Sequence, residues 1–231
     1  KENDVSMGAS KANSGIVHSG YDPVPGTLKA KFNIKGAEMM EQVTTDLGVK
    51  YEKNGTLVVA YTDEDMIKLK ELYIQGKKND VKELKLMDGI ETRRIEPNLS
   101  RAIIGALYAP SSAVICPHQL TIAAIGNAMD NGVDLKLNFN VSSINKHGET
   151  YEIEPLVGCV VKTKCIINAA GIYSDKIAKM VGDTSFEITP RYGEYILFDT
   201  ECSSLISSTI FRAPTKMGKG VTLTKEELIA L

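Results

Sequence analysis

The sequence predicts a mixed α/β protein of the α+β kind, with a substantial antiparallel part. Two observations predict this class. Segments with helical apolar spacing alternate with short strand-like runs, in the order helix, strands, helix, strands, helix, strands, helix, strands. Gly, Pro and Asn-Gly turn signals separate the runs. The 231 residues suffice for one large domain or two small interleaved ones.

Three helices are predicted in the first half of the chain, each with a recognisable start or stop. Residues 27–46 carry an approximate apolar stripe, and Gly48 follows as a stop signal. Thr62 caps a helix of about a dozen residues, with Asp65 at its third position as in a capping box. A short helix spans 88–96 and ends before a proline.

Strands are predicted between these helices. Asn54-Gly55 lies between two strand-like runs, 49–52 and 56–61, and predicts a hairpin. Residues 84–86 alternate like an edge strand, and residues 103–109 form a further strand.

The second half begins with a helix from Pro117, which Asn131-Gly132 ends. Its expected buried side chains are Leu120, Ile122, Ala123, Ile125 and Met129. Strands are predicted at 133–139 and 141–144, followed by a hairpin of 151–154 with 160–163.

The last third combines a buried strand, a helix and more strands. Residues 165–168 form a continuous apolar run, expected to be buried on both faces. A helix then runs from Ser174-Asp175 to Met180. One or two strands are predicted within 187–199, and 224–228 resembles a capped helix start.

Composition excludes several functional classes. Hydrophobic residues are 43% and charged residues 24%, as in soluble globular proteins and unlike disordered, collagen-like or disulfide-packed chains. The 27 basic and 29 acidic residues give a net charge of −2, which provides no global electrostatic basis for binding nucleic acid. No apolar run approaches the ~20 residues of a transmembrane helix.

Cysteines and histidines indicate neither disulfides nor a metal. The four cysteines form no C-x-x-C pair and have apolar neighbours, which predicts buried reduced thiols in a cytoplasmic protein. The three histidines are far apart and lack the spacing of zinc ligands. We therefore predict no metal site.

Two segments have the residue types that suit a phosphate or a flat cofactor. In 165–175 an apolar strand ends at small residues before a helix, which directs backbone N–H groups toward a ligand. Packing alone is an equal alternative there. Residues 8–15 are rich in Gly, Ser and Asn, and their alternative is a flexible surface loop.

These segments resemble a known family. The run Ser10-Lys11-Ala12-Asn13-Ser14-Gly15-Ile16-Val17-His18-Ser19-Gly20-Tyr21-Asp22, followed by residues 25–31, closely resembles the second flavin motif of bacterial FAD-dependent glycerol-3-phosphate dehydrogenases. These enzymes belong to the D-amino-acid-oxidase-like flavoprotein superfamily, and the related L-2-hydroxyglutarate oxidases share much of this stretch. Further matches lie at 117–120, 166–175, 190–195 and 214–220.

The chain departs from the family at both ends. The family opens with a strand, a G-x-G-x-x-G turn and a helix that hold the FAD pyrophosphate. No G-x-G-x-x-G occurs here, and Lys1-Glu2 aligns just after the expected acidic residue. The chain therefore resembles a member without its dinucleotide-binding start, and we expect it to bind FAD poorly by itself. The resemblance ends near residue 221.

The resemblance implies a fragment of an FAD-binding oxidoreductase fold with an interleaved antiparallel-sheet substrate domain. Residues 1–48 and 111–183 would belong to the FAD domain, residues 49–110 and 184–224 to the substrate domain, and 225–231 to neither.

The resemblance also implies site residues. Ser10, Lys11, Ala12, Asn13, Ser14 and Gly15 would line the flavin pyrophosphate and ring, and Val141 would contact the adenine through its backbone. Ala169, Ala170, Gly171 and Tyr173 would lie along the cofactor. His18 would be the base or fix the flavin ring, and a structural histidine is an equal alternative.

An anionic substrate needs a cation, and the planar Arg fork suits phosphate or carboxylate. Arg191 is the first candidate for this catalytic and binding role, with Lys216 and Arg212 as second choices. Tyr195 would close the pocket, and a core tyrosine is its equal alternative.

The function implied is FAD-dependent oxidation of a small anionic secondary alcohol, glycerol 3-phosphate to dihydroxyacetone phosphate, by hydride transfer to the flavin. Oxidation of L-2-hydroxyglutarate is the alternative on the same fold. A non-catalytic domain fragment unable to hold FAD is the alternative of another class. We expect a cytoplasmic protein, peripheral at the membrane only through a partner. Oxygen, a quinone and a partner or subunit are alternative electron acceptors.

Overall fold

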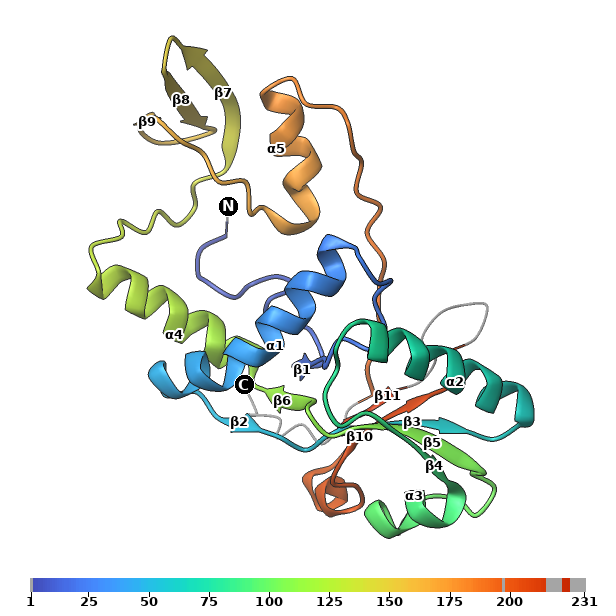
Figure 1. The fold of residues 1–231 in the computed structure, drawn as a ribbon. Helices are drawn as coiled ribbons and strands as arrows, with labels where there is room; N and C mark the ends of the chain where they lie inside the picture. The colour runs from blue at the N-terminus through green and yellow to red at the C-terminus, as the bar shows by residue number, and fades with distance from the viewer. Residues whose placement is uncertain (1, 197, 215–221, 225–231) are drawn as a thin grey trace. The chain divides into compact units, whose positions relative to one another are not determined.

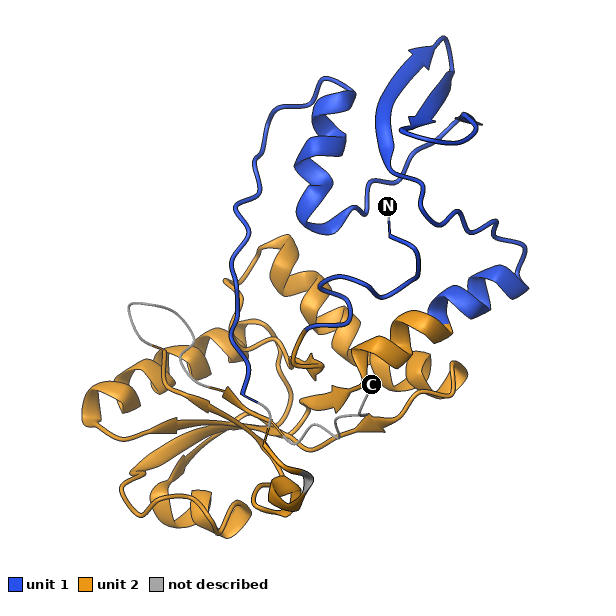
Figure 2. Cartoon of the chain, turned by 180° about the vertical axis from the view of Figure 1, so that it is seen from behind, with its two compact units in different colours: residues 1–12, 124–196 blue, residues 13–123, 197–231 orange. Residues whose placement is uncertain are grey.

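The computed structural model describes residues 2–196, 198–214 and 222–224. The chain divides into two compact units, which Figure 2 shows in different colours. Unit 1 comprises residues 1–12 and 124–196, and unit 2 comprises residues 13–123 and 197–231. Helices and strands alternate along both (Figure 1), which confirms the predicted mixed α/β class. The assignment of segments to a flavin domain and a substrate domain stays a prediction.

Unit 2 is built on a five-stranded sheet with the order β11-β10-β3-β5-β4. Strand β10 runs parallel to β3, and all other neighbours are antiparallel. All five residues of the central strand β3 are buried, because the sheet is covered on both faces. The strands are β3 (Thr56–Ala60), β4 (Lys85–Asp88), β5 (Gly105–Ala109), β10 (Thr209–Arg212) and β11 (Thr222–Leu223).

Alternate side chains of this sheet enter two separate cores. On one face Val58, Leu107 and Phe211 pack with Leu69 of helix α2 (Asp63–Lys78). On the other face Leu57, Val59 and Ile210 pack with Met87 and Ile103. Figure 1 shows α2 on one side of the sheet and α3 (Gly89–Ile95) on the other.

A second, small sheet holds the start of unit 2, in the order β1-β6-β2. Its strands are β1 (Ile16–Val17), β2 (Tyr51–Glu52) and β6 (Ala113–Ile115), and helix α1 (Leu28–Asp46) connects β1 to β2. The predicted hairpin around Asn54-Gly55 is wrong, since β2 pairs with β6 whereas β3 pairs with β5 and β10. The Gly55 N–H bonds the Ser112 carbonyl at 3.0 Å, so this turn crosses between two sheets.

The helix starts agree with the sequence, because capping is a local interaction. Thr27 and Thr62 accept hydrogen bonds from the backbone N–H groups of Ala30 and Asp65. Asp88 forms a complete capping box at the start of α3. Helix α2 is longer than expected and spans 16 residues.

Helix α4 (Pro117–Asp130) precedes the sheet of unit 1. That sheet is an antiparallel meander of β7 (Val141–His147), β8 (Thr150–Pro155) and β9 (Val161–Thr163), which confirms the predicted hairpin. A 3₁₀ turn, η1 (Gly171–Tyr173), then leads into helix α5 (Ser174–Met180).

Several expectations of strands and burial are wrong. Residues 133–139 and 165–168 are not strands, and neither are the described residues of 187–199. Ile167 is 87% exposed, and Ile122 and Met129 of α4 are 47% and 50% exposed. The α1 stripe is also open, with Leu28 70% exposed. An apolar pattern indicates that a segment can be buried by another part of the protein. Among the described residues, no part buries these segments.

The cysteines are free, as expected, but their burial was overestimated. Cys159 and Cys165 are exposed, and Cys116 and Cys202 are partly buried. Cys165 is exposed because the strand predicted to bury it does not form. The helix start expected at 224–228 lies outside the described residues, apart from Thr224.

A buried carboxylate joins the end of α3 to the segment before β10. Glu96 is 2% exposed, and its Oε1 accepts hydrogen bonds from the backbone N–H groups of Ser207 (2.9 Å) and Ser208 (2.6 Å) and from the Ser207 hydroxyl. Asn98 adds a bond from its side-chain amide to the Leu205 carbonyl at 2.9 Å. These contacts fix the approach of β10 to β3.

We therefore expect Glu96→Ala to lower the free energy of unfolding by about 3 kcal/mol, because two N–H donors and one hydroxyl lose their acceptor. Glu96→Gln keeps an acceptor oxygen and should cost about 1 kcal/mol. Urea unfolding followed by circular dichroism measures both values. Glu201→Ala, at an exposed position of the same segment, is the control and should stay within about 0.5 kcal/mol. Equal effects of Glu96→Ala and the control would contradict the structural role.

Candidate active site

The first predicted flavin residues form an exposed turn in unit 1. The backbone N–H groups of Lys11 and Ala12 donate to the Gly8 carbonyl at 3.0 and 3.3 Å. The side chains of Ser10, Lys11 and Ala12 are exposed. This turn presents small and polar groups to its surroundings, as the sequence predicts for the loop.

Asn13, Ser14 and Gly15 continue this loop in unit 2, where the small sheet fixes them. The Gly15 N–H donates to Asn13 Oδ1 at 2.9 Å, and the Gly15 carbonyl accepts from Ile115 N–H at 2.9 Å. Gly15 has φ +61°, and a Cβ there would lie 2.2 Å from the Ile115 carbonyl oxygen. Glycine is therefore required by the neighbouring strand β6.

His18 follows β1 and is half-buried. Its ring lies against Phe211 of β10, with ring centroids 5.8 Å apart and an interplanar angle of 34°. Its backbone carbonyl accepts a hydrogen bond from Asn33 Nδ2 of α1 at 3.3 Å. The next residue, Ser19, is buried. Contacts from β10 and α1 thus hold this histidine.

Tyr21, three residues further on, is buried against α2. Burial raises the pKa of its phenol, and the neighbouring Asp22 carboxylate raises it further. Tyr21 therefore stays neutral throughout the physiological range and serves as an anchor for the loop rather than as a proton acceptor.

The late predicted flavin segment is open. Ala169, Gly171 and Tyr173 are exposed, and Ala170 is half-buried. Gly171 has φ +57°, and a Cβ there would meet no atom within 4 Å. Asn168 shapes the segment, since its Oδ1 accepts from Ala170 N–H at 3.3 Å and its Nδ2 donates to the Ser174 carbonyl at 2.8 Å.

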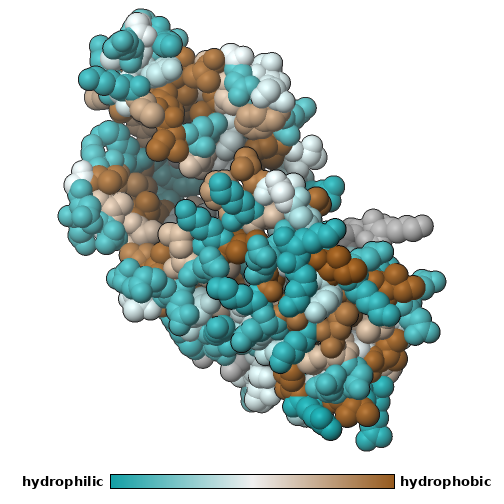
Figure 3. Space-filling model, viewed as in Figure 1, coloured by the Kyte–Doolittle hydropathy of each residue, from teal (hydrophilic) through white to brown (hydrophobic). Residues whose placement is uncertain are grey.

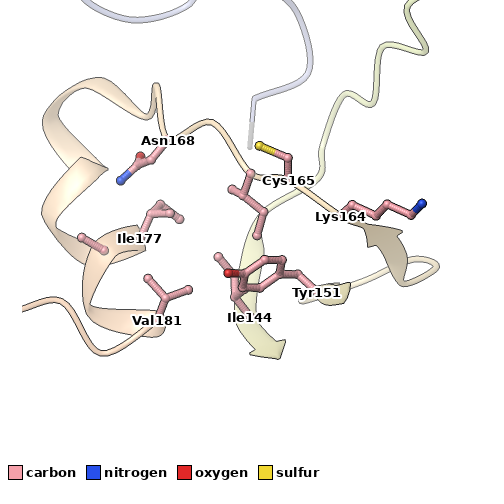
Figure 4. A pocket seen from close by; sticks show the side chains of 9 residues that line it. Ile144, Tyr151, Lys164, Cys165, Asn168, Ile177 and Val181 are labelled. Atoms are coloured by element: carbon pink, nitrogen blue, oxygen red, sulfur yellow. The ribbon is translucent and has the colours of Figure 1, made fainter. Parts of the chain in front are cut away.

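An apolar pocket of about 270 Å³ adjoins this segment within unit 1. Figure 4 shows Ile177 and Val181 facing Ile144 and Tyr151 across it, while the Lys164 side chain extends away. Hydrophobic surface gathers between the β7–β8 hairpin and α5 in Figure 3. The lining suits an apolar or aromatic group better than a phosphate. It comprises Ile144, Tyr151, Lys164, Cys165, Ile166, Asn168, Ile177, Ala178 and Val181.

The other candidates lie at different places in the fold. Val141 is half-buried at the start of β7, beside an irregularity in the β7–β8 register. Arg191 and Tyr195 are exposed in unit 1. The Arg212 guanidinium stacks over the Tyr61 ring at 5.4 Å. Lys216 lies outside the described residues.

The structure thus brings Asn13, Ser14, Gly15 and His18 together in unit 2, which also holds Arg212, and places the remaining described candidates in unit 1. Sequence reasoning missed Asn33 and Phe211, which contact His18. Asn33 lies outside the apolar stripe expected for α1, so that stripe gave no signal for it. The sequence offered none for Phe211, because its contact depends on the position of β10.

Among the described residues, no group of three or more His, Cys, Asp or Glu side chains is arranged to hold a metal ion. In the same part of the chain, no helix combines the length and the apolar character needed to cross a membrane.

Comparison with known proteins gives consistent matches over nearly the whole chain. A family model described as FAD dependent oxidoreductase (DAO) matches residues 1–227. A glycerol 3-phosphate dehydrogenase from Caloramator mitchellensis is 42% identical over 97% of this chain and 46% of its own length. A mitochondrial L-2-hydroxyglutarate dehydrogenase from Nematostella vectensis is 29% identical over 93% of this chain and 50% of its own length.

A solved structure agrees with these matches. Dithionite-reduced L-α-glycerophosphate oxidase from Mycoplasma pneumoniae, with FAD bound, superposes with a TM-score of 0.83 and 28% identity. The match covers 97% of this chain and 60% of that structure. The chain therefore spans about half the length of the curated relatives it matches.

The two glycines of the first loop provide a matched test of this geometry. We expect Gly15→Ala to lower the free energy of unfolding by about 3 kcal/mol, because its Cβ meets a backbone oxygen at a positive φ. Gly8→Ala should be neutral, since a Cβ there meets nothing within 4 Å. Thermal unfolding followed by circular dichroism measures both. A Gly15→Ala midpoint as high as that of Gly8→Ala would disprove the steric argument.

Proposed function

The chain belongs to the family of FAD-dependent oxidoreductases of the DAO type, and from that premise we propose that it forms part of an enzyme that oxidises glycerol 3-phosphate to dihydroxyacetone phosphate. The observation that carries this proposal is the identity with the Caloramator glycerol 3-phosphate dehydrogenase, which is higher than the identity with the L-2-hydroxyglutarate dehydrogenase. Glycerol 3-phosphate is one member of the proposed substrate class, the small anionic secondary alcohols.

One feature of the structure is compatible with FAD, namely open space beside the backbone at Gly171. The open backbone around Gly171, where a Cβ would meet no atom, leaves room for a close approach. Ala169, Ala170, Gly171 and Tyr173 would lie along the cofactor there, and Val141 would contact the adenine through its backbone. The loop residues Ser10, Lys11, Ala12, Asn13, Ser14 and Gly15 would line the pyrophosphate and ring. When bound, FAD supplies the two-electron acceptor of the reaction.

His18 is our candidate for the group that takes the hydroxyl proton of the substrate. A general base must be held within hydrogen-bond reach of that proton. The contact with Phe211 and the bond from Asn33 to its carbonyl restrict the position of His18. Neutral imidazole can accept the proton at a ring nitrogen while the substrate carbon is oxidised.

Arg191 is our candidate for binding the anionic group of the substrate. Its side chain is exposed, and its planar fork matches the oxygens of phosphate or carboxylate. Tyr195, four residues later and 59% exposed, would close the substrate-binding pocket. Lys216 would add a second cation to it. An electron-accepting partner and a cytoplasmic location complete the proposal.

A flavin spectrum tests the substrate. The polypeptide at the length its gene encodes is loaded with FAD under anaerobic conditions and mixed with glycerol 3-phosphate, or separately with L-2-hydroxyglutarate. We expect glycerol 3-phosphate alone to bleach the oxidised flavin bands, because hydride transfer reduces the flavin.

The other outcomes each contradict a different part of the proposal. Bleaching by L-2-hydroxyglutarate alone would replace the substrate with the second candidate, whose relatives also match most of this chain. A stable flavin that neither compound bleaches would remove both substrates. Failure to retain FAD would favour the non-catalytic alternative.

In the same preparation, Arg191→Met should raise KM for glycerol 3-phosphate by about 100-fold, because a charge-assisted contact to the phosphate is worth roughly 1.5–3 kcal/mol. The maximal rate should change much less, since uniform binding is lost. Arg94→Met, at an exposed position of α3, is the matched control and should leave KM unchanged. Steady-state kinetics would refute the role of Arg191 if both variants behaved alike.

A further inference from the structure

The loop after His18 is held by side-chain amides of α2. Four consecutive backbone carbonyls, those of residues 20–23, each accept a hydrogen bond from one of two amides. Asn79 Nδ2 donates to the Gly20 carbonyl at 3.0 Å and to the Pro23 carbonyl at 2.7 Å. Gln75 Nε2 donates to the carbonyls of Tyr21 and Asp22 at 3.3 and 2.6 Å. We call Gln75 and Asn79 the amide clamp.

The clamp is part of the packed core rather than a surface contact. Asn79 is 6% exposed, and its own backbone N–H closes the last turn of α2 through the Gln75 carbonyl at 3.0 Å. Tyr21 is 5% exposed. It packs so closely on α2 that a Cβ on Gly76 would lie 2.9 Å from the Tyr21 Cβ. Helix and loop therefore form one rigid body at this place.

His18 lies two residues before the clamped carbonyls. Its own carbonyl is bonded by Asn33, and its ring lies against Phe211. The backbone on both sides of His18 is thus fixed, by β1 before it and by the clamp after it. With only Ser19 between His18 and Gly20, a movement of the clamped carbonyls would reorient the imidazole.

We propose that Asn79, assisted by Gln75, is a positioning residue that fixes the imidazole of His18 against Phe211. The proposal rests on the proposed function, in which His18 takes the substrate's proton. An amide is the side chain that this place requires, because it must donate to two carbonyls and carry no charge. A carboxylate of the same shape would offer no donor and would repel both oxygens.

Nuclear magnetic resonance of the 231-residue chain tests the proposal without a cofactor. The chain has three histidines, and His18→Gln identifies the imidazole signal of His18. We expect Asn79→Asp to shift that signal and abolish its cross-peak to the Phe211 ring. The signals of His118 and His147 should stay in place, because these residues lie outside the clamp.

Two further variants make the result decisive. Asn131→Asp is the matched control, since Asn131 also follows a helix but its amide donates back to the Asn127 carbonyl of that helix, at 2.8 Å. Gln75→Met removes the other two donors and should shift the His18 signal in the same sense by less. If Asn79→Asp does not fold, Gln75→Met decides the question alone.

Three outcomes would overturn the proposal: an unmoved His18 signal, equal movement of all three histidines, or the same effect from Asn131→Asp. A failure of the proposed function looks different. In the flavin-loaded polypeptide, His18→Gln with full kcat would remove the role of His18 in proton transfer, while the spectra of the clamp variants would be unaffected.

Discussion

The parallel pairing of β10 with β3 is the contact on which the rest of unit 2 depends. Residues 209–212 align with residues 56–59, although most of the chain separates them. This pairing covers one edge of β3, whose other edge pairs with β5, and it brings Phe211 to the face that carries Tyr21 and α2. Glu96 guides the chain into this pairing from one side, and Asn54 does so by donating to the Ser207 carbonyl and Thr209 Oγ1. The position of His18 is therefore a consequence of sheet topology.

The sequence predicted what local interactions decide. The three helices of the first half begin at the expected positions, where Thr27, Thr62 and Asp88 cap them, and Thr62 was itself predicted as a cap. A cap involves residues within one turn, so local sequence indicates it. The Asn54-Gly55 hairpin failed for the opposite reason. The local turn signal is real, but Gly55 donates to the Ser112 carbonyl and Asn54 donates to the Ser207 carbonyl, and these bonds direct the two strands into different sheets.

Burial expectations failed where a segment needs a cover that comes from elsewhere. Residues 165–168 have the composition of a buried strand, yet Ile167 is exposed and no strand forms there. A strand forms only where neighbouring strands pair with it and other side chains pack on it, so an apolar composition alone does not determine that a strand forms. Residue types alone pointed to 8–15 and 165–175 as segments that suit a phosphate or a flat cofactor, but only the family resemblance gave individual residues a role. The role of Asn79 was not predictable at all, since it depends on two carbonyls that are remote in sequence.

Two glycines in the segments that resemble flavin motifs show that a glycine in a motif can be explained by the structure of the chain itself, without a ligand. Gly15 and Gly171 both have positive φ, and both occur where the resemblance places the cofactor. At Gly15 a side chain would strike the chain's own backbone, so packing alone requires glycine. At Gly171 a side chain would meet no atom within 4 Å, and the positive φ by itself accounts for a glycine, as it does at Gly132 and Gly182. Neither glycine therefore requires a ligand. The open 169–173 segment leaves room for a cofactor, and the case for FAD rests on the family match over residues 1–227.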